Sequence, residues 1–211
     1  HVTLDVAEES IQKPVIRCDE SLYYDMLSAF CKSLRGSDAD AAMAWFARLL
    51  YAGVDPRLIA RRIIAHASED VGLANPTAML QAVAASQALE AVGLPEARLP
   101  LAEAAVLLAT APKSNSAHNA IIAAMQDIER GRVGDIPRHL KNVHADSTGA
   151  DKAPAYKYPH NYPDHYVQQR YLPESLGDTH YYAYGENKTE QAAKRYWDDI
   201  KGKNGNGSAV T

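Results

Sequence analysis

Glycines at positions 36, 53, 72 and 93 divide the first half of this chain into segments whose apolar residues recur with the period of a helix. In the first segment these residues are Tyr23, Met26, Leu27, Phe30, Cys31 and Leu34. Their spacing of i, i+3, i+4 and i+7 places them on one helix face. Glycine commonly ends a helix because it enters the left-handed backbone region without steric cost. The pattern therefore predicts a series of helices joined by tight turns, with Gly36 as the first left-handed stop.

Residues that cap helices stand at the starts of the following segments. Ser37 or Asp38 can cap the second helix. The pairs Asp55-Pro56 and Asn75-Pro76 each offer an N-cap followed by proline at the first helical position. The faces that we expect to be buried are Ala42, Trp45, Phe46, Leu49 and Leu50, then Ile59, Ile63, Ile64 and Ala67, then Leu80, Val83, Ala84 and Ala88.

A nearly uncharged stretch, residues 101–111, follows Pro95 and predicts a central helix that is buried all round. Ser114 or Asn115 starts one more helix, whose predicted inner residues are Ala117, Ile121, Met125 and Ile128. No segment before residue 140 shows the alternation of a strand. We therefore predict an all-α fold, a stacked helical bundle.

The second half of the chain has a different character. Residues 151–184 contain 8 of the 12 tyrosines, interleaved with prolines, so an irregular Tyr/Pro-rich extension is predicted over residues 142–186. A last helix is expected at 187–201, and a disordered tail at 202–211. Tyrosine packs well with its hydroxyl at a wet rim. We therefore expect the extension to lie against its own domain or another copy, with the candidate interface residues Tyr158, Tyr162, Tyr166 and Tyr171.

Charge argues against general nucleic-acid binding but leaves a local patch open. The 211 residues carry a net charge of −4, so contact with DNA needs a local group of cations. Arg57, Arg61 and Arg62 cluster on one predicted helix and are the candidate DNA contacts. A second group follows another helix: Arg130, Arg132, Arg138 and Lys141. The alternative interpretation is a solvated helix face.

Motifs for catalysis are weak. The sequence has no glycine-rich phosphate loop ending in Gly-Lys-Ser or Gly-Lys-Thr, so no ATP site is expected in this chain. His66, Glu69 and Asp70 share one helix face and could hold a metal ion. A salt bridge to Arg48 or Arg57 is the favoured interpretation of these carboxylates.

Other reactive residues have structural interpretations. Ser114 and Ser116 near His118 resemble a nucleophile and its base, but helix capping explains Ser114 better. Cys31 lies on an apolar face and is interpreted as a core residue. His160 and His165 are interpreted as surface or interface residues. Two cysteines, Cys18 and Cys31, cannot make a disulfide framework, so a reduced cytosolic compartment is expected.

No signal peptide is visible in the sequence, and no apolar run reaches the length of a membrane span. The chain opens with His1 and an amphipathic stretch, Thr3–Ile11. We therefore expect a C-terminal piece of a longer polypeptide, with a trimmed natural N-terminus as the alternative.

Four runs together resemble one family. They are Lys32–Ala42 (KSLRGSDADAA), Ala67–Ala74 (ASEDVGLA), Leu108–Asn115 (LATAPKSN) and the run Tyr156–Pro163 (YKYPHNYP) with its continuation Tyr166–Glu174. In this order they are similar to the C-terminal part of the replication-associated recombination ATPases, the RarA/MgsA group, which includes proteins that interact with the Werner helicase.

The resemblance implies an AAA+ ATPase related to clamp loaders that acts at stalled replication forks, in recombination and in repair. ATP and Mg²⁺ would bind an N-terminal module outside this chain. Residues 1–16 would end the helical lid of that module, and residues 17–141 would form an oligomerisation domain that resembles the clamp-loader collar. Implied partners are further copies in a homotetramer, DNA and single-strand-binding protein, in a cytoplasmic, nucleoid-associated setting.

Three functional hypotheses remain. The first is a tetramerisation domain, with Trp45, Phe46 and the tyrosines as the places to look for an interface, although an intramolecular core is the favoured interpretation of Trp45 and Phe46. The second is a DNA-contact module that uses the arginine clusters. The third is a stand-alone metal enzyme at His66, Glu69 and Asp70. No catalytic residue is predicted in this chain.

Overall fold

A computed structural model describes residues 19–141 and 156–205, and within these ranges every regular element is a helix. The all-α prediction is therefore confirmed. The chain divides into two compact units, His1–Ser114 and Asn115–Thr211. This division precedes the predicted boundary at residue 141, so the helix after Ser114 belongs to the second unit. The predicted lid segment 1–16 lies outside the described residues.

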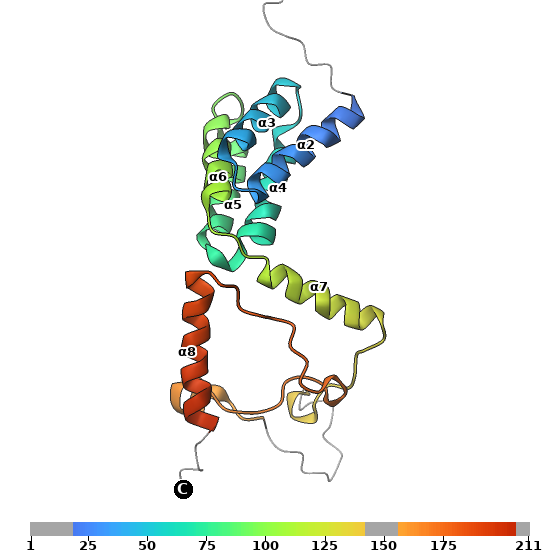
Figure 1. The fold of residues 1–211 in the computed structure, drawn as a ribbon, viewed down its shortest axis with the longest axis vertical. Coiled ribbons are helices and arrows are strands. Elements are labelled where there is room, and N and C mark those ends of the chain that lie inside the picture. The colour runs from blue at the N-terminus through green and yellow to red at the C-terminus, as the bar shows by residue number, and fades with distance from the viewer. Residues whose placement is uncertain (1–18, 142–155, 206–211) are drawn as a thin grey trace, which may run out of the picture. The chain divides into compact units, whose positions relative to one another are not determined.

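The described residues of the first unit form five α-helices (Figure 1): α2 (Glu20–Arg35), α3 (Ala39–Tyr51), α4 (Pro56–His66), α5 (Thr77–Val92) and α6 (Arg98–Thr110). Helix α6 packs against each of the other four, which confirms its predicted central place. Fully buried side chains from all five helices, among them Phe30, Ile59 and Leu108, share one hydrophobic core. Burying each such side chain stabilises the fold by about 1.5–3 kcal/mol.

Two of the predicted caps are present. Asp38 accepts a hydrogen bond from the amide three residues later at 2.8 Å and starts α3. Asp55 accepts from the amide of Arg57 at 2.9 Å, with Pro56 at the first position of α4. Asn75 is different, because its side chain accepts from the hydroxyl of Thr77 and gives α5 no cap. The prediction for Asn75 was therefore wrong.

The turn after α2 uses its glycine for space. Gly36 keeps a right-handed backbone, φ −76°, and Ser37 takes the left-handed conformation, φ 61°. A Cβ atom at Gly36 would lie 3.1 Å from the carbonyl oxygen of Lys32. The predicted left-handed stop at Gly36 was therefore wrong, since the left-handed residue is Ser37, one position later, and Gly36 instead avoids a tight contact with the carbonyl of Lys32.

Helix α5 buries a face other than the predicted one. Leu80 and Val83 are exposed, Leu80 at 69%. The buried residues are Ala78, Ala82, Ala85 and Leu89. Because α5 packs against α4 and α6, alanines permit a closer approach of the helices than leucine would. Helix α6 is also less enclosed than predicted, since Leu99 and Val106 are exposed.

The second unit contains α7 (Ser116–Glu129), an irregular segment with short 3₁₀ turns, and α8 (Lys188–Gly205). The described part of the Tyr/Pro-rich extension is irregular, as predicted. Helix α8 runs four residues beyond its predicted end at 201. The predicted inner residues of α7 were wrong: Ala117, Ile121, Met125 and Ile128 are all exposed, and Asp127 is the buried residue of this helix.

Candidate assembly surfaces and a basic pocket

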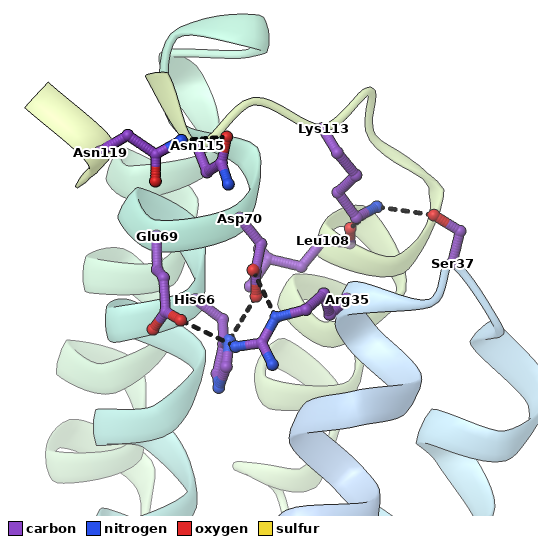
Figure 2. Close-up of polar contacts among 9 residues, drawn as sticks. All are labelled: Arg35, Ser37, His66, Glu69, Asp70, Leu108, Lys113, Asn115 and Asn119. Atoms are coloured by element: carbon purple, nitrogen blue, oxygen red, sulfur yellow. Dashed lines mark hydrogen bonds and ion pairs between the residues drawn. The ribbon is translucent and has the colours of Figure 1, made fainter. Parts of the chain in front are cut away.

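A charged cluster closes the C-terminal end of α4. Arg35 from α2 donates its Nε to Asp70 Oδ1 at 2.7 Å and its Nη2 to Glu69 Oε1 at 2.8 Å (Figure 2). Asp70 Oδ2 also forms a hydrogen bond with His66 Nδ1 at 2.5 Å. The chain forms a π-helical turn over Ala67–Val71 directly after α4, and this turn carries both carboxylates. The predicted partners Arg48 and Arg57 were wrong, and Arg35 is the cation.

The same geometry bears on the metal hypothesis. The ligand atoms of His66, Glu69 and Asp70 lie within 4.8 Å of one another. However, the guanidinium of Arg35 already binds both carboxylates, and its hydrogen bond to Asp70 raises the pKa of Arg35. A metal ion would have to displace this guanidinium. The cluster therefore fits an ion-pair network that joins α2 to α4.

Lys113 closes the C-terminal end of α6. Its Nζ donates to the carbonyls of Leu108, Ala109 and Ala111 at 2.8–3.1 Å and to Ser37 Oγ at 2.9 Å. A cation among the last carbonyls of a helix satisfies acceptors that have no amide partner. The contact to Ser37 also ties the α2–α3 turn to α6, as Figure 2 shows. Lys113 is therefore a structural residue, and burial lowers its pKa.

The two serines proposed as nucleophiles have other partners. Ser114 donates its backbone amide to the carbonyl of Asp70 at 2.7 Å. Ser116 donates its hydroxyl to Glu190 at 2.5 Å. His118 is exposed on α7. The bond to Glu190 therefore gives Ser116 a structural role, and the N-cap residue of α7 is Asn115, the other residue predicted to start this helix.

A basic pocket of about 320 Å³ lies between α2 and α4. Lys32 and Arg35 line it from α2, and Arg62 and His66 line it from α4, while Glu69 contributes the carboxylate that pairs with Arg35. The exposed ring of Tyr24 also lines it, beside Cys31, a partly buried thiol whose pKa is raised by that burial. Cations beside an exposed aromatic ring are the features that bind phosphates and stack bases.

The three candidate DNA-contact arginines are used differently. Arg57 donates to both carboxylate oxygens of Glu90, at 2.7 and 3.2 Å. Arg61 is exposed, and Arg62 lines the basic pocket. In the second predicted group, Arg132 lies 3.3 Å from the carboxylate of Asp127. Arg62 is therefore the candidate that lies beside further cations in the structure. These cations, Lys32 and Arg35, come from α2, which the sequence pattern did not suggest as a DNA contact.

An apolar groove of about 600 Å³ runs along the first unit. It is lined by side chains from α3, the turn at Leu94 and Pro95, and the start of α6, including Leu99. Phe46 reaches it from the core, where it is 4% exposed, and Trp45 is partly buried against the same core. These positions confirm the core interpretation of both aromatic residues.

The candidate interface tyrosines lie in the second unit. Tyr158, Tyr162 and Tyr171 are exposed, whereas Tyr166 packs its ring 6.1 Å from that of Trp197. Their part in an interface stays a prediction. His160 and His165 are exposed and their rings pack at a tilt of 49°, with centroids 4.8 Å apart, which fits the predicted surface position.

Sequence reasoning missed two buried carboxylates in the second unit. Glu190, 2% exposed, accepts hydrogen bonds from Tyr182, Asn187 and the amide of Gly185, besides Ser116. Asn187 in turn accepts from the amide of Glu190 at 3.0 Å. This reciprocal pair caps the start of α8 in the manner of a capping box, with the side-chain amide of Asn187 in place of its backbone amide, and the spacing Asn-x-x-Glu was the signal that could have revealed it.

The second buried carboxylate is Asp127 near the end of α7. It accepts the hydroxyl of Tyr181 at 2.9 Å and pairs with Arg132. Tyr181 and Tyr182 are neighbours in the chain, yet one bonds to α7 and the other to α8. The aromatic extension is thus fixed to both helices of its own unit.

The fold and these surfaces define an all-helical domain with an aromatic extension, and no helix among the described residues is long and apolar enough to cross a membrane. The chain belongs to the family described as MgsA AAA+ ATPase C terminal, whose model matches residues 36–201. The resemblance read from the four sequence runs is thereby confirmed.

Named relatives agree with this assignment. The chain is 47% identical over 206 residues to replication-associated recombination protein A of Bacillus subtilis, which covers 95% of this chain and 48% of the relative. It is 48% identical over 184 residues to an uncharacterised AAA domain-containing protein of Mycobacterium tuberculosis, covering 86% and 41%. An ATPase of Dictyostelium discoideum, WRNIP1, is 38% identical over 168 residues, covering 77% and 19%. The chain thus spans less than half the length of these relatives.

Proposed function

We propose that this chain is the self-association domain of an AAA+ ATPase of the replication-associated recombination group, and that it gathers four copies into a homotetramer. The observation that carries the proposal is the exposed apolar row of α7, which consists of Ile121, Ile122, Met125 and Ile128. Each of these side chains is between 45% and 57% exposed. They fall at i, i+1, i+4 and i+7 and so share one helix face.

Exposure of this kind is unfavourable in an isolated molecule. Covering a large apolar side chain gains about 1.5–3 kcal/mol, and contiguous exposed apolar patches mark interaction surfaces. A stable contact needs about 1,000 Å² of total buried area or more. The row is therefore expected to bind a complementary apolar surface. A second copy of the chain carries such a surface and is present wherever the first copy is.

Equilibrium sedimentation tests the proposal. The chain is expected to sediment as a tetramer at tens of micromolar, and Met125→Glu is expected to shift it toward monomer because a carboxylate would be buried unpaired. The matched control is Gln126→Glu, which adds the same charge at the next, polar position of α7. A wild-type chain that stays monomeric over this range would overturn the proposal.

The proposal extends to the whole protein. ATP and Mg²⁺ would bind an N-terminal module, so that this chain has no catalytic site of its own. DNA and single-strand-binding protein would be partners of the full-length protein, in the cytoplasm and at the nucleoid. The names of the relatives support the connection with replication and recombination. ATP hydrolysis by full-length protein and none by this chain is the expected result.

DNA contact by this chain is the second candidate function, favoured by the basic pocket. Arg62→Gln and Lys32→Gln are each expected to weaken binding of a fork substrate several-fold and to lower the slope of log affinity against log salt by about 1. Arg57→Gln is the control, since Glu90 already neutralises this arginine. No binding of fork DNA at low salt would exclude the second candidate.

A further inference from the structure

The groove of the first unit and the row of α7 are complementary in chemistry. The groove is lined mostly by carbon atoms, and its charged member is Arg98. The Nε of Arg98 donates to the carbonyl of Pro95 at 2.7 Å. No carboxylate among the described residues pairs with this arginine. An occupant with an apolar row beside a carboxylate would therefore match the groove.

Helix α7 has this character. Its apolar row runs to Ile128, and the exposed carboxylate of Glu129 follows directly. The sequence of α7, SAHNAIIAAMQDIE, contains no lysine or arginine. A helix that presents anchors at i, i+4 and i+7 is the form in which helices bind apolar grooves. Charge and spacing thus match α7 to the groove.

We propose that the apolar row of α7 in one copy binds in the α3–α6 groove of a second copy, with Glu129 beside Arg98. This inference rests on the proposed self-association and names its two surfaces. Because the row and the groove are different patches, the contact is heterologous, and successive contacts close into a ring when the rotation allows it. A homotetramer is then a ring of four identical contacts.

An α7-to-α7 contact is the competing arrangement. It would cover the rows but leave the apolar groove of every copy in water, and it would leave Arg98 without a carboxylate. Binding of the row in the groove covers both apolar surfaces and pairs opposite charges. The heterologous contact therefore buries more apolar area for each copy.

Two variants separate these arrangements. Met125→Glu damages the row, and Leu99→Glu damages the groove at a side chain that is 75% exposed and contributes little to the core. Each variant alone is expected to lose at least ten-fold in association constant. Val106→Glu, an exposed apolar position on α6 that does not line the groove, is the matched control and should stay tetrameric. Circular dichroism checks that each variant keeps its helices.

The decisive measurement mixes the two variants in equal amounts and follows them by sedimentation velocity. The intact row of Leu99→Glu can bind the intact groove of Met125→Glu, so a 1:1 dimer that grows no further is expected. Absence of that dimer, or a Leu99→Glu variant that stays tetrameric, overturns the inference. If the wild-type chain is a tetramer in the same experiment, the proposed function survives that failure; a monomeric wild type ends both.

Discussion

Tyr182 donates its hydroxyl to the buried carboxylate of Glu190 at 2.8 Å, and this bond connects the aromatic extension to the first turn of α8. The carboxylate of Glu190 accepts hydrogen bonds from hydroxyl, side-chain amide and backbone donors. A carboxylate in this position is expected to dominate the stability of the second unit, because four donors would lose their acceptor together.

Glu190→Ala is expected to lower the free energy of unfolding of the second unit by about 3 kcal/mol, since each unsatisfied buried donor costs about 1–3 kcal/mol. Urea denaturation followed by the fluorescence of Trp197 measures this, in a Trp45→Phe background that removes the signal of the first unit. Glu186→Ala, an exposed glutamate in the same turn, is the control and should change stability by less than about 0.5 kcal/mol. Equal effects of the two substitutions would contradict the role of Glu190.

The bond between Tyr182 and Glu190 also predicts a dependence on alkaline pH. Burial, followed by the bond to Glu190, raises the pKa of Tyr182 from its ordinary value of 10.0 to about 12. The neutral phenol is therefore favoured in the folded state. Its contribution is fully present below pH 10 and is lost as the pH rises through 12.

Tyr182→Phe removes this contribution at every pH. The difference in unfolding free energy between wild type and Tyr182→Phe should therefore shrink between pH 10 and pH 12. Urea titrations at pH 9 and 11 measure it, and absorbance at tyrosinate wavelengths gives the titration itself. A difference that is constant over this range would show that Tyr182 ionises normally in the folded protein.

At the end of α4, Asp70 and Glu69 share the guanidinium of Arg35 but differ in burial. Asp70 is 8% exposed and also bonds to His66, whereas Glu69 is partly exposed. Asp70→Ala is expected to cost about 3 kcal/mol because it leaves Arg35 Nε and His66 Nδ1 without their acceptor, while Arg35 Nη2 keeps Glu69. Glu69→Ala removes a screened contact and should cost less than about 1 kcal/mol.

The fluorescence of Trp45 in a Trp197→Phe background measures both substitutions in the first unit. Sodium chloride provides the control, because screening should reduce the effect of Glu69→Ala and leave most of the effect of Asp70→Ala. If Glu69→Ala proved the more damaging substitution, the buried bond of Asp70 would not be the main link between α2 and α4.

The sequence was sufficient for the elements that are defined by local rules. Asp38 and Asp55 cap their helices as predicted, and Phe46 is buried as its spacing requires. Local rules failed where apolar residues surround a helix on all sides. In α5, the choice between the faces of Leu80 and Ala82 depends on how closely α4 and α6 approach, which is a property of the packed bundle.

Candidate site residues were predictable only as groups. The run of arginines indicated a cationic surface. Spacing could not show that Glu90 pairs with Arg57, or that Lys32 and Arg62 line the same pocket. The α7 row was predicted to be buried because its period is that of an amphipathic helix. Period alone does not tell which surface covers a row, so a row that binds another molecule looks like a core residue pattern.

Alanine substitutions at Gly72 and Gly53 separate the cost of backbone strain in a turn from the cost of close packing in the first unit. Both have positive φ, 46° and 78°, so alanine at either position costs about 1–2 kcal/mol in backbone strain. They differ in space: a Cβ at Gly72 would lie 2.7 Å from the carbonyl oxygen of Ser114, whereas nothing lies within 4 Å of a Cβ at Gly53. The Ser114 amide is itself bonded to Asp70 in the turn that holds the charged cluster. Gly72→Ala should therefore be the more destabilising by about 1–2 kcal/mol, measured by urea denaturation, and equal losses at both positions would mean that Ser114 moves away freely.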